Sequence, residues 1–296
     1  MQAFSEERQK RAEEVVKRVK LPSQPAIVIE INQELGLEAP DFKKIAELVS
    51  QDVAISAKVI NVVNSPFFGL SRKVESIVQA LTLMGLQNFY NVILTTCLQE
   101  ALGADDEDGK VFWGHSIRTA VAARHIAQSL GATLLADEIT PDQAYITGLF
   151  HDCGVPIMVQ KDSKYEKISA FSISHRRDII VAEDKYFDTD HCIIGQMMAR
   201  SWSLSENIHK TILHHHSSDF LSDPDIPIKL VSILQLADYI AYSYDFSVGA
   251  VDHIINSEWE IEEWAESREQ ILDELVLSVE DIQEYKSELF EQFALE

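Results

Sequence analysis

The chain has 296 residues, of which 46% are hydrophobic, and a formal net charge of −23 at pH 7. This length and composition predict a globular protein with a sizeable core and about two domains, at roughly 100–200 residues each. The negative charge repels nucleic-acid phosphates and anionic lipids, so we expect neither direct DNA binding nor membrane association.

The sequence contains no apolar run of about 18 residues and no charged-then-apolar leader, so we expect a cytoplasmic protein. Its three cysteines, Cys97, Cys153 and Cys192, are widely spaced and form no Cys-x-x-Cys motif. A disulfide framework or a thiolate zinc site is therefore not expected, and the cysteines are interpreted as small buried residues.

Helical periodicity dominates the first third of the chain, and no segment alternates as a strand would. Residues 1–20 pair acids with bases four positions later, as in Glu6 and Lys10, which predicts a charged helix. We expect further helices at 26–35, from 41 to about 49, at 53–63, from the cap Ser76 to Gly85, and at 87–102. The acidic segment 103–109 is the best candidate for a boundary.

The middle of the chain continues the pattern. An alanine-rich helix is expected over 116–130, with His115 at its start and Gly131 closing it. Thr140 and Gln143 match a capping box for a helix that runs to Gly154 and carries His151 and Asp152 in its last turn.

Three further helices complete the predicted core. One is capped by Asp188 or Thr189 and has His191 in its first turn. A second capping box at 203–206 begins a helix on which His215 faces inward. The last begins at 225–227 and places Asp238 in an apolar stripe. Because burying an unpaired carboxylate costs several kcal/mol, Asp238 requires a cation, a strong donor or a metal.

The C-terminal segment 256–296 holds fourteen acidic residues against two basic ones, Arg268 and Lys286. It also carries apolar residues at helical intervals: Trp264, Ile271, Leu275, Leu289 and Phe293. We interpret it as docked helices with a solvated acidic face; the alternative is a disordered acidic arm.

One series of side chains indicates chemistry. Imidazoles and carboxylates, the ligands of borderline and hard cations, recur on successive predicted helices: His115, His151-Asp152, His191, His214-His215-His216 and Asp238. Taken singly, each histidine could be a hydrogen-bonded core residue, the triple run an exposed helix end, and Asp238 an acceptor between helices. Their joint order favours one metal site. His125, His175, His209 and His253 are assigned to the surface or to routine packing.

This series resembles the signature of the HD superfamily of metal-dependent phosphohydrolases, which is a His, a His-Asp doublet and a later Asp on an all-helical bundle. The N-terminal half is more closely similar to the HDOD (HD-related output) domain, on these segments: Leu21-Pro22-Ser23-Gln24-Pro25, Val49-Ser50-Gln51-Asp52, Asn64-Ser65-Pro66-Phe67-Phe68-Gly69-Leu70 and Ser76-Ile77-Val78-Gln79-Ala80-Leu81. The resemblance covers about residues 21–245.

The resemblance implies an all-α multi-helix bundle with an HD-like core. Four parts are expected: a charged helix at 1–20, an N-terminal helical half at 21–103, an HD-like half with the metal site at 110–245, and acidic helices at 250–296. By position, His115, His151, Asp152 and Asp238 match the core ligands of the superfamily. His191 and the pair His214-His215 match the extra histidines of HD-GYP cyclic dinucleotide phosphodiesterases, which hold two or more metals.

Two functions follow from the resemblance. HDOD proteins are mainly bacterial signalling modules, which implies contacts with protein partners or sensing of a nucleotide or cyclic dinucleotide. The alternative is a metal-dependent phosphohydrolase in which Asp152 bridges two ions, drawn from iron, manganese or zinc, that activate a water. Here Val155 stands where those phosphodiesterases have a lysine, and 217–220 lacks their Gly-Tyr-Pro motif. These departures favour the non-catalytic function.

Overall fold

The computed structural model describes residues 10, 13–14, 16–17, 21–64, 73–103, 107–161, 165, 178–217, 220–249, 264–265 and 268–295. All regular elements in these residues are helical, which confirms the predicted all-α fold. The chain divides into two compact units: Pro22–Ala104 with Glu291–Glu296, and Asp105–Phe290 with Met1–Leu21. Most of the predicted N-terminal helix and the segment 65–70 lie outside the described residues.

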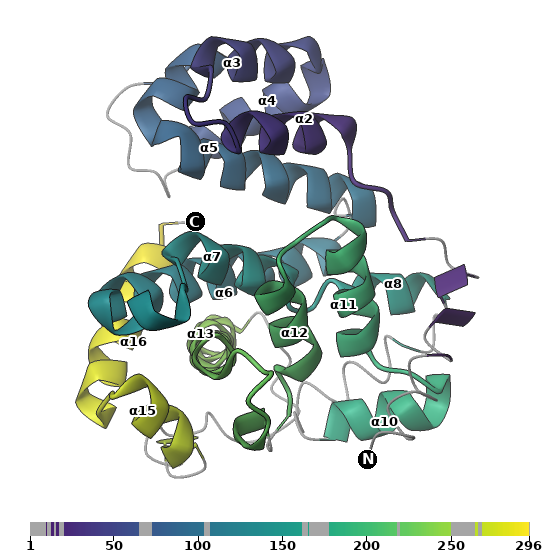
Figure 1. Ribbon diagram of the computed structural model, residues 1–296, viewed down its shortest axis with the longest axis vertical. Coiled ribbons are helices and arrows are strands. Elements are labelled where there is room, and N and C mark those ends of the chain that lie inside the picture. The colour runs from purple at the N-terminus through teal and green to yellow at the C-terminus, as the bar shows by residue number, and fades with distance from the viewer. Residues whose placement is uncertain are drawn as a thin grey trace. The chain divides into compact units, whose positions relative to one another are not determined.

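The described helices of the 22–104 unit are α2 (Ala26–Leu35), α3 (Phe42–Gln51), α4 (Val53–Val63) and α5 (Ile77–Leu102). The first three each pack against α5 (Figure 1). The predicted starts of α4 and α5 are confirmed by their caps, because Asp52 accepts hydrogen bonds from two backbone N–H groups of α4 and Ser76 accepts one from Gln79. Gly85 interrupts α5 with a φ of 74°, a conformation that glycine adopts without strain.

Among the described residues, α5 is the one helix whose length and composition would suffice to cross a membrane. Half of its apolar window is buried within the protein, and Gly85 breaks its course. Both features fit the core helix of a folded unit.

The 105–290 unit is built around α13 (Ile228–Ser247). Packed against α13 are α6 (Glu107–Leu130), α7 (Pro141–Phe150), α12 (Glu206–His214) and α15 (Glu269–Leu275) (Figure 1). The helix α11 (His191–Ser201) packs against α12 and α8 (Gly154–Lys161). The remaining elements are α10 (Asp178–Phe187), α16 (Val279–Phe293) and the 3-10 helices η2 (Gly131–Asp137) and η3 (Phe220–Ser222).

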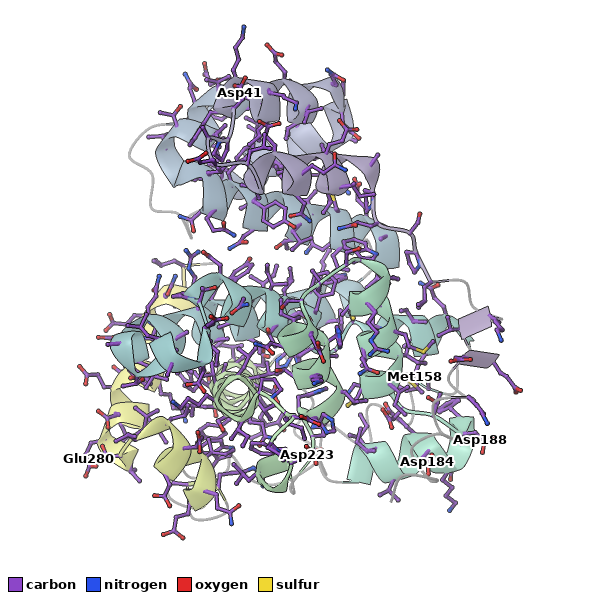
Figure 2. The ribbon with its side chains drawn as sticks, viewed as in Figure 1. Asp41, Met158, Asp184, Asp188, Asp223 and Glu280 are labelled. Carbon is purple, nitrogen blue, oxygen red and sulfur yellow. The ribbon has the colours of Figure 1, made fainter. Side chains whose placement is uncertain are left out.

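The prediction of docked C-terminal helices is confirmed for the described residues. Phe290 of α16 stacks edge-on against Tyr244 of α13, and Glu288 lies 3.1 Å from His125 of α6. The apolar residues that predicted the docking are all buried: Trp264, Ile271, Leu275, Leu289 and Phe293. Glu280 of α16 is exposed, as are Asp188 and Asp223 elsewhere on this unit (Figure 2).

The predicted start of the helix that carries His115 is wrong. The helix α6 begins at Glu107, so His115 lies about two turns inside it. The acidic segment read as a connection therefore contributes to a helix.

The predicted end of the next helix is also wrong. The helix α7 stops at Phe150, and α8 begins at Gly154. His151 and Asp152 therefore lie in the turn between the two helices. The backbone turns at once because Cys153 N–H bonds to Phe150 O and Val155 N–H bonds to Asp152 O.

The capping box predicted at 203–206 is wrong as well. Ser203 has a φ of 57° and belongs to the end of α11, where Ser203 N–H bonds to Arg200 O and Leu204 N–H bonds to Ala199 O. This pair of bonds is a Schellman motif, which requires a left-handed residue. The cap of α12 is Ser205, whose side chain makes no cap hydrogen bond.

The start of α11 is displaced in a similar way. Its cap is Asp190, which accepts a hydrogen bond from Ile193 N–H, and not the predicted Asp188 or Thr189. Asp188 has a left-handed φ of 59° and follows the end of α10. His191 is therefore the first residue of α11.

The capping box of α7 gives a direct test of this local reading. Thr140 accepts a hydrogen bond from Gln143 N–H, and Gln143 Oε1 accepts one from Thr140 N–H. We predict that Thr140→Ala lowers the free energy of unfolding by about 1 kcal/mol, as measured by urea denaturation. Ser205→Ala is the matched control and should change it far less, since Ser205 makes no side-chain cap bond. Equal losses in the two variants would contradict the assignment.

Candidate metal centre

Four histidines of the 105–290 unit share one hydrogen-bonding pattern. In each, ring nitrogen Nδ1 bonds to a protein oxygen at 2.7–2.8 Å: His115 to Asp245, His151 to the Gly148 carbonyl, His191 to Glu183, and His215 to the Ile212 carbonyl. For His151 and His215, whose acceptors are carbonyls, Nδ1 carries the proton and Nε2 presents a lone pair. An imidazole that binds a metal through Nε2 is commonly oriented by such a bond from its Nδ1.

The carboxylate of Asp152 lies between these Nε2 atoms. Its Oδ2 is 3.1 Å from His151 Nε2, while its Oδ1 is 3.4 Å from both His191 Nε2 and His215 Nε2. The two imidazole nitrogens are 3.5 Å apart. Ligand atoms about 2.1 Å from a tetrahedral ion are separated by about 3.4 Å, so this triangle has the edge length of a coordination face.

Two atoms of this group lack hydrogen bonds. His151 Nε2 and Asp152 Oδ1 are buried and have no hydrogen-bond partner, although His151 Nε2 lies 3.1 Å from Asp152 Oδ2 and Asp152 Oδ1 lies 3.4 Å from His191 Nε2 and His215 Nε2. Buried polar atoms are normally satisfied, and a cation bound by both would satisfy them. These residues therefore fit a divalent metal.

His115 forms the other side of the group. Its Nε2 is 3.1 Å from Asp238 Oδ1, and its Nδ1 bonds to Asp245, which also pairs with Arg118. His115, His151 and Asp152 could together hold one ion, since one ligand atom from each lies within 4.8 Å of the others. Asp238 stands on α13 beside His115 and is 8% exposed.

The electrostatics of the group favour positive charge. Burial disfavours the imidazolium of His115, yet Asp238 and Asp245 raise its pKa to about 10. Burial likewise disfavours the Asp152 carboxylate, but His151, His215 and His191 hold its pKa well below the usual range. The carboxylates thus create a negative potential that attracts a cation, whether a proton or a metal ion.

Glycine allows the helices to meet at this point. A Cβ atom on Gly154 would lie 2.1 Å from His191 O, so the start of α8 reaches the start of α11 only because residue 154 has no side chain. The Cβ position of Gly195 on α11 lies 3.6 Å from Gly154 N. The glycine that follows His151-Asp152-Cys153 therefore sets the distance between Asp152 and His191.

The structure brings together six of the seven residues that the sequence singled out: His115, His151, Asp152, His191, His215 and Asp238. His214, the last residue of α12, belongs to neither group of possible ligands. His216 does belong to one, with its ring centroid 4.0 Å from that of His215 and 5.0 Å from that of His191.

Sequence reasoning missed the two carboxylates that orient the histidines. Asp245 follows Asp238 by seven residues and so lies on the same face of α13, a spacing that could have identified it. Glu183 is fully buried on α10, and its carboxylate accepts hydrogen bonds from His191 N–H and Nδ1 and from the Tyr165 hydroxyl. It belongs to no histidine series, so the sequence carried no signal for it.

Of the four histidines that were not assigned to the site, two lie in the described residues. His125 pairs with Glu288 and His209 is buried in α12, as expected for surface contact and packing. His175 and His253 lie outside the described residues. All three cysteines are free and buried, which confirms that part of their prediction.

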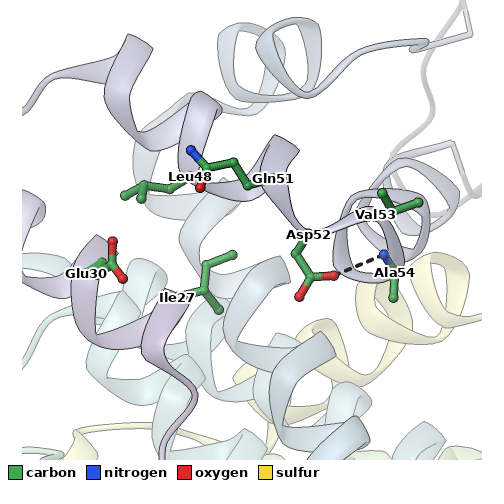
Figure 3. Close-up of a pocket in the computed structure, with 7 residues that line it drawn as sticks. All are labelled: Ile27, Glu30, Leu48, Gln51, Asp52, Val53 and Ala54. Atoms are coloured by element: carbon green, nitrogen blue, oxygen red, sulfur yellow. Dashed lines mark hydrogen bonds between the residues drawn. The ribbon is translucent and has the colours of Figure 1, made fainter.

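A hollow of about 480 Å³ lies in the 22–104 unit (Figure 3). Its lining contains no histidine or cysteine, and consists of Ile27, Glu30, Leu48, Gln51, Asp52, Val53 and Ala54. The groups of possible metal ligands lie in the other unit.

The protein is thus an all-helical bundle with a candidate metal centre of histidines and aspartates. The family model of the HDOD domain matches residues 21–218. The chain belongs to the HDOD domain family.

Solved structures agree with this assignment. An HDOD domain protein of unknown function from Geobacter sulfurreducens has a TM-score of 0.75 and 26% identity, covering 98% of this chain and 97% of that one. A "Putative signal transduction protein" from Marinobacter aquaeolei VT8 has a TM-score of 0.73 and 17% identity, covering 97% and 64%. A "Putative phosphohydrolase" from Shewanella amazonensis SB2B has a TM-score of 0.70 and 21% identity, covering 95% and 97%. The last two matches establish the shared fold alone.

A curated relative is longer. An uncharacterized protein of Treponema pallidum (strain Nichols) is 30% identical over 204 residues, which are 67% of this chain and 38% of that protein. The chain therefore spans less than two fifths of the length of this relative.

The close approach at Gly154 gives one prediction. Gly154→Ala should lower the free energy of unfolding by about 1–3 kcal/mol and reduce the bound metal, because the new methyl group displaces His191. Gly36→Ala is the control: its Cβ would meet atoms no nearer than 3.5 Å, and its φ of −75° suits alanine. Denaturation and elemental analysis measure both effects. An unchanged Gly154→Ala protein would refute the packing argument.

A second prediction concerns Glu183. Glu183→Gln should weaken metal binding by about 10–100-fold, because an amide holds the Nδ1 proton of His191 less strongly than a carboxylate. Competition with a chelator measures the affinity. Glu206→Gln, which removes an exposed acid paired with Lys210, should leave the affinity unchanged. If both variants bind metal equally well, Glu183 does not orient a ligand.

Proposed function

We propose that this protein is a bacterial signalling module of the HDOD family that retains a divalent-metal site and acts through protein partners or ligand sensing. The observation that carries the proposal is the burial of three histidines of the ligand group. His151 and His191 are each 1% exposed and His215 is 3% exposed. Structural metal sites are closed by protein ligands, whereas catalytic sites keep a position open.

The residues around the doublet support the same function. Val155 offers no charge for a substrate phosphate, and it stands one residue after the glycine that contacts α11. The bound metal would supply a fixed positive charge. The ligands would then tie α6, α11 and α13 and the turns after α7 and α12 to one point, so that binding or loss of metal changes the packing of these elements.

The second candidate is a metal-dependent phosphohydrolase acting on a nucleotide or cyclic dinucleotide. It is favoured by the two oxygens of Asp152, which face different histidines, with Oδ2 toward His151 and Oδ1 toward His191 and His215. A carboxylate placed in this way can bridge two ions that activate a shared water for attack on phosphorus. The Asp152 side chain is 22% exposed, so a small substrate could approach it.

Metal analysis together with a substrate screen separates the two functions. For protein purified without chelators, we predict about two divalent ions of iron, manganese or zinc per chain. We predict no turnover of phosphomonoesters, phosphodiesters or nucleotides. Asp152→Ala should remove both ions and Asp238→Ala at least part of the metal, while Asp223→Ala, which removes an exposed acid, should remove none.

Two results would count against the proposal. Metal-dependent turnover that Asp152→Ala abolishes without unfolding the protein would assign the phosphohydrolase function. Protein that stays metal-free after reconstitution with iron, manganese or zinc would leave a helical scaffold without a metal site.

A further inference from the structure

Cys192 is the one cysteine that lies among the histidines of the candidate centre. It is the second residue of α11 and is 3% exposed. Its Sγ is 3.5 Å from His191 Nε2 and 3.6 Å from His215 Nδ1. One ligand atom from each of His191, Cys192, His215 and His216 lies within 4.8 Å of the others.

The distance between Cys192 Sγ and His191 Nε2 is the distance expected between two ligands of one ion. A nitrogen about 2.1 Å and a sulfur about 2.3 Å from one tetrahedral ion are about 3.6 Å apart. The Sγ of Cys192 is 3.5 Å from His191 Nε2, which also forms the 3.4 and 3.5 Å edges to Asp152 Oδ1 and His215 Nε2. His191 Nε2 therefore lies at the spacing of two ligands of one ion from each of Cys192 Sγ, Asp152 Oδ1 and His215 Nε2.

We propose that Cys192 binds, as a thiolate, the ion that His191, His215 and Asp152 share. The inference rests on the proposed metal site and adds a ligand that the resemblance to HD proteins does not supply. On binding, the Sγ–H bond breaks, the proton passes to solvent and a metal–sulfur bond forms without a change of oxidation state. Thiolate among imidazole ligands favours zinc over manganese or magnesium at this position.

The other two cysteines serve as controls. Cys153 is buried beside the site, but its thiol faces α11, where Sγ lies 3.8 Å from Gly195 O, and burial raises its pKa. Cys97 lies on α5 in the other unit, and burial raises its pKa to about 12. Neither belongs to a group of possible ligands.

Cobalt substitution tests the proposal on the full chain. The protein loaded with Co²⁺ should show a near-ultraviolet thiolate-to-cobalt charge-transfer band. Cys192→Ser should lose this band and bind zinc about tenfold more weakly or worse, since it removes one ligand. Cys153→Ser should keep the band and the affinity. X-ray absorption at the zinc edge of the unaltered protein should detect one sulfur at about 2.3 Å, a measurement that does not depend on the variants folding.

A failure of the thiolate assignment can be distinguished from a failure of the proposed metal site. Bound cobalt without the charge-transfer band, or a band that survives in Cys192→Ser, would overturn the thiolate assignment and leave the metal site standing. A zinc shell made only of nitrogen and oxygen would do the same. If no cobalt or zinc binds at all, both the thiolate and the proposed metal site are wrong.

Discussion

The structure of the 105–290 unit depends on the contact between the Asp152 carboxylate and the imidazoles that surround it. A largely desolvated carboxylate is costly unless its charge is balanced, and a cation held between Asp152 and the Nε2 atoms of His151, His191 and His215 would balance it. Imidazoles are equally unfavourable when buried with free nitrogens. Each side therefore needs the other, and a cation between them satisfies both.

This constraint explains where the helices end. His151 follows the last residue of α7, His191 is the first residue of α11, and His215 follows the last residue of α12. Side chains at helix ends can converge on a point, whereas the bodies of the helices must pass one another. His115 and Asp238 come from within α6 and α13, which pack directly together. The glycine at position 154 then allows the start of α8 to touch α11.

The sequence predicted most helices because their signals are local. The Thr140 capping box, the Ser76 cap and the break at Gly85 depend on neighbouring residues alone, and the structure confirms all three. The misplaced start of α6 and the false box at 203–206 arose where one pattern permits two structures. An acidic run suits both a connection and a helix start, and a serine can end one helix while another serine begins the next.

The candidate site divides in the same way. The order of histidines and aspartates along the chain identified most of the residues that lie around Asp152. These ligands recur on successive predicted helices, and this regular series made them recognisable. Sequence reasoning correctly placed His215 facing inward, but it selected His214 as its partner where the structure groups His216, since one residue rotates a side chain by about 100° around a helix. Glu183 contacts His191, and Cys192 contacts His215, only because the folded chain brings them together. Contacts of this kind can be recognised only in the folded structure.

A pair of ions held by Asp152 defines the proposed metal centre. Anomalous X-ray scattering from crystals of protein purified without chelators measures this directly. We predict two peaks roughly 3.5–4 Å apart, one beside His115 and His151 and the other beside His191 and His215, with Asp152 between them. A metal bound elsewhere, or full metal loading with no peak at Asp152, would contradict the account.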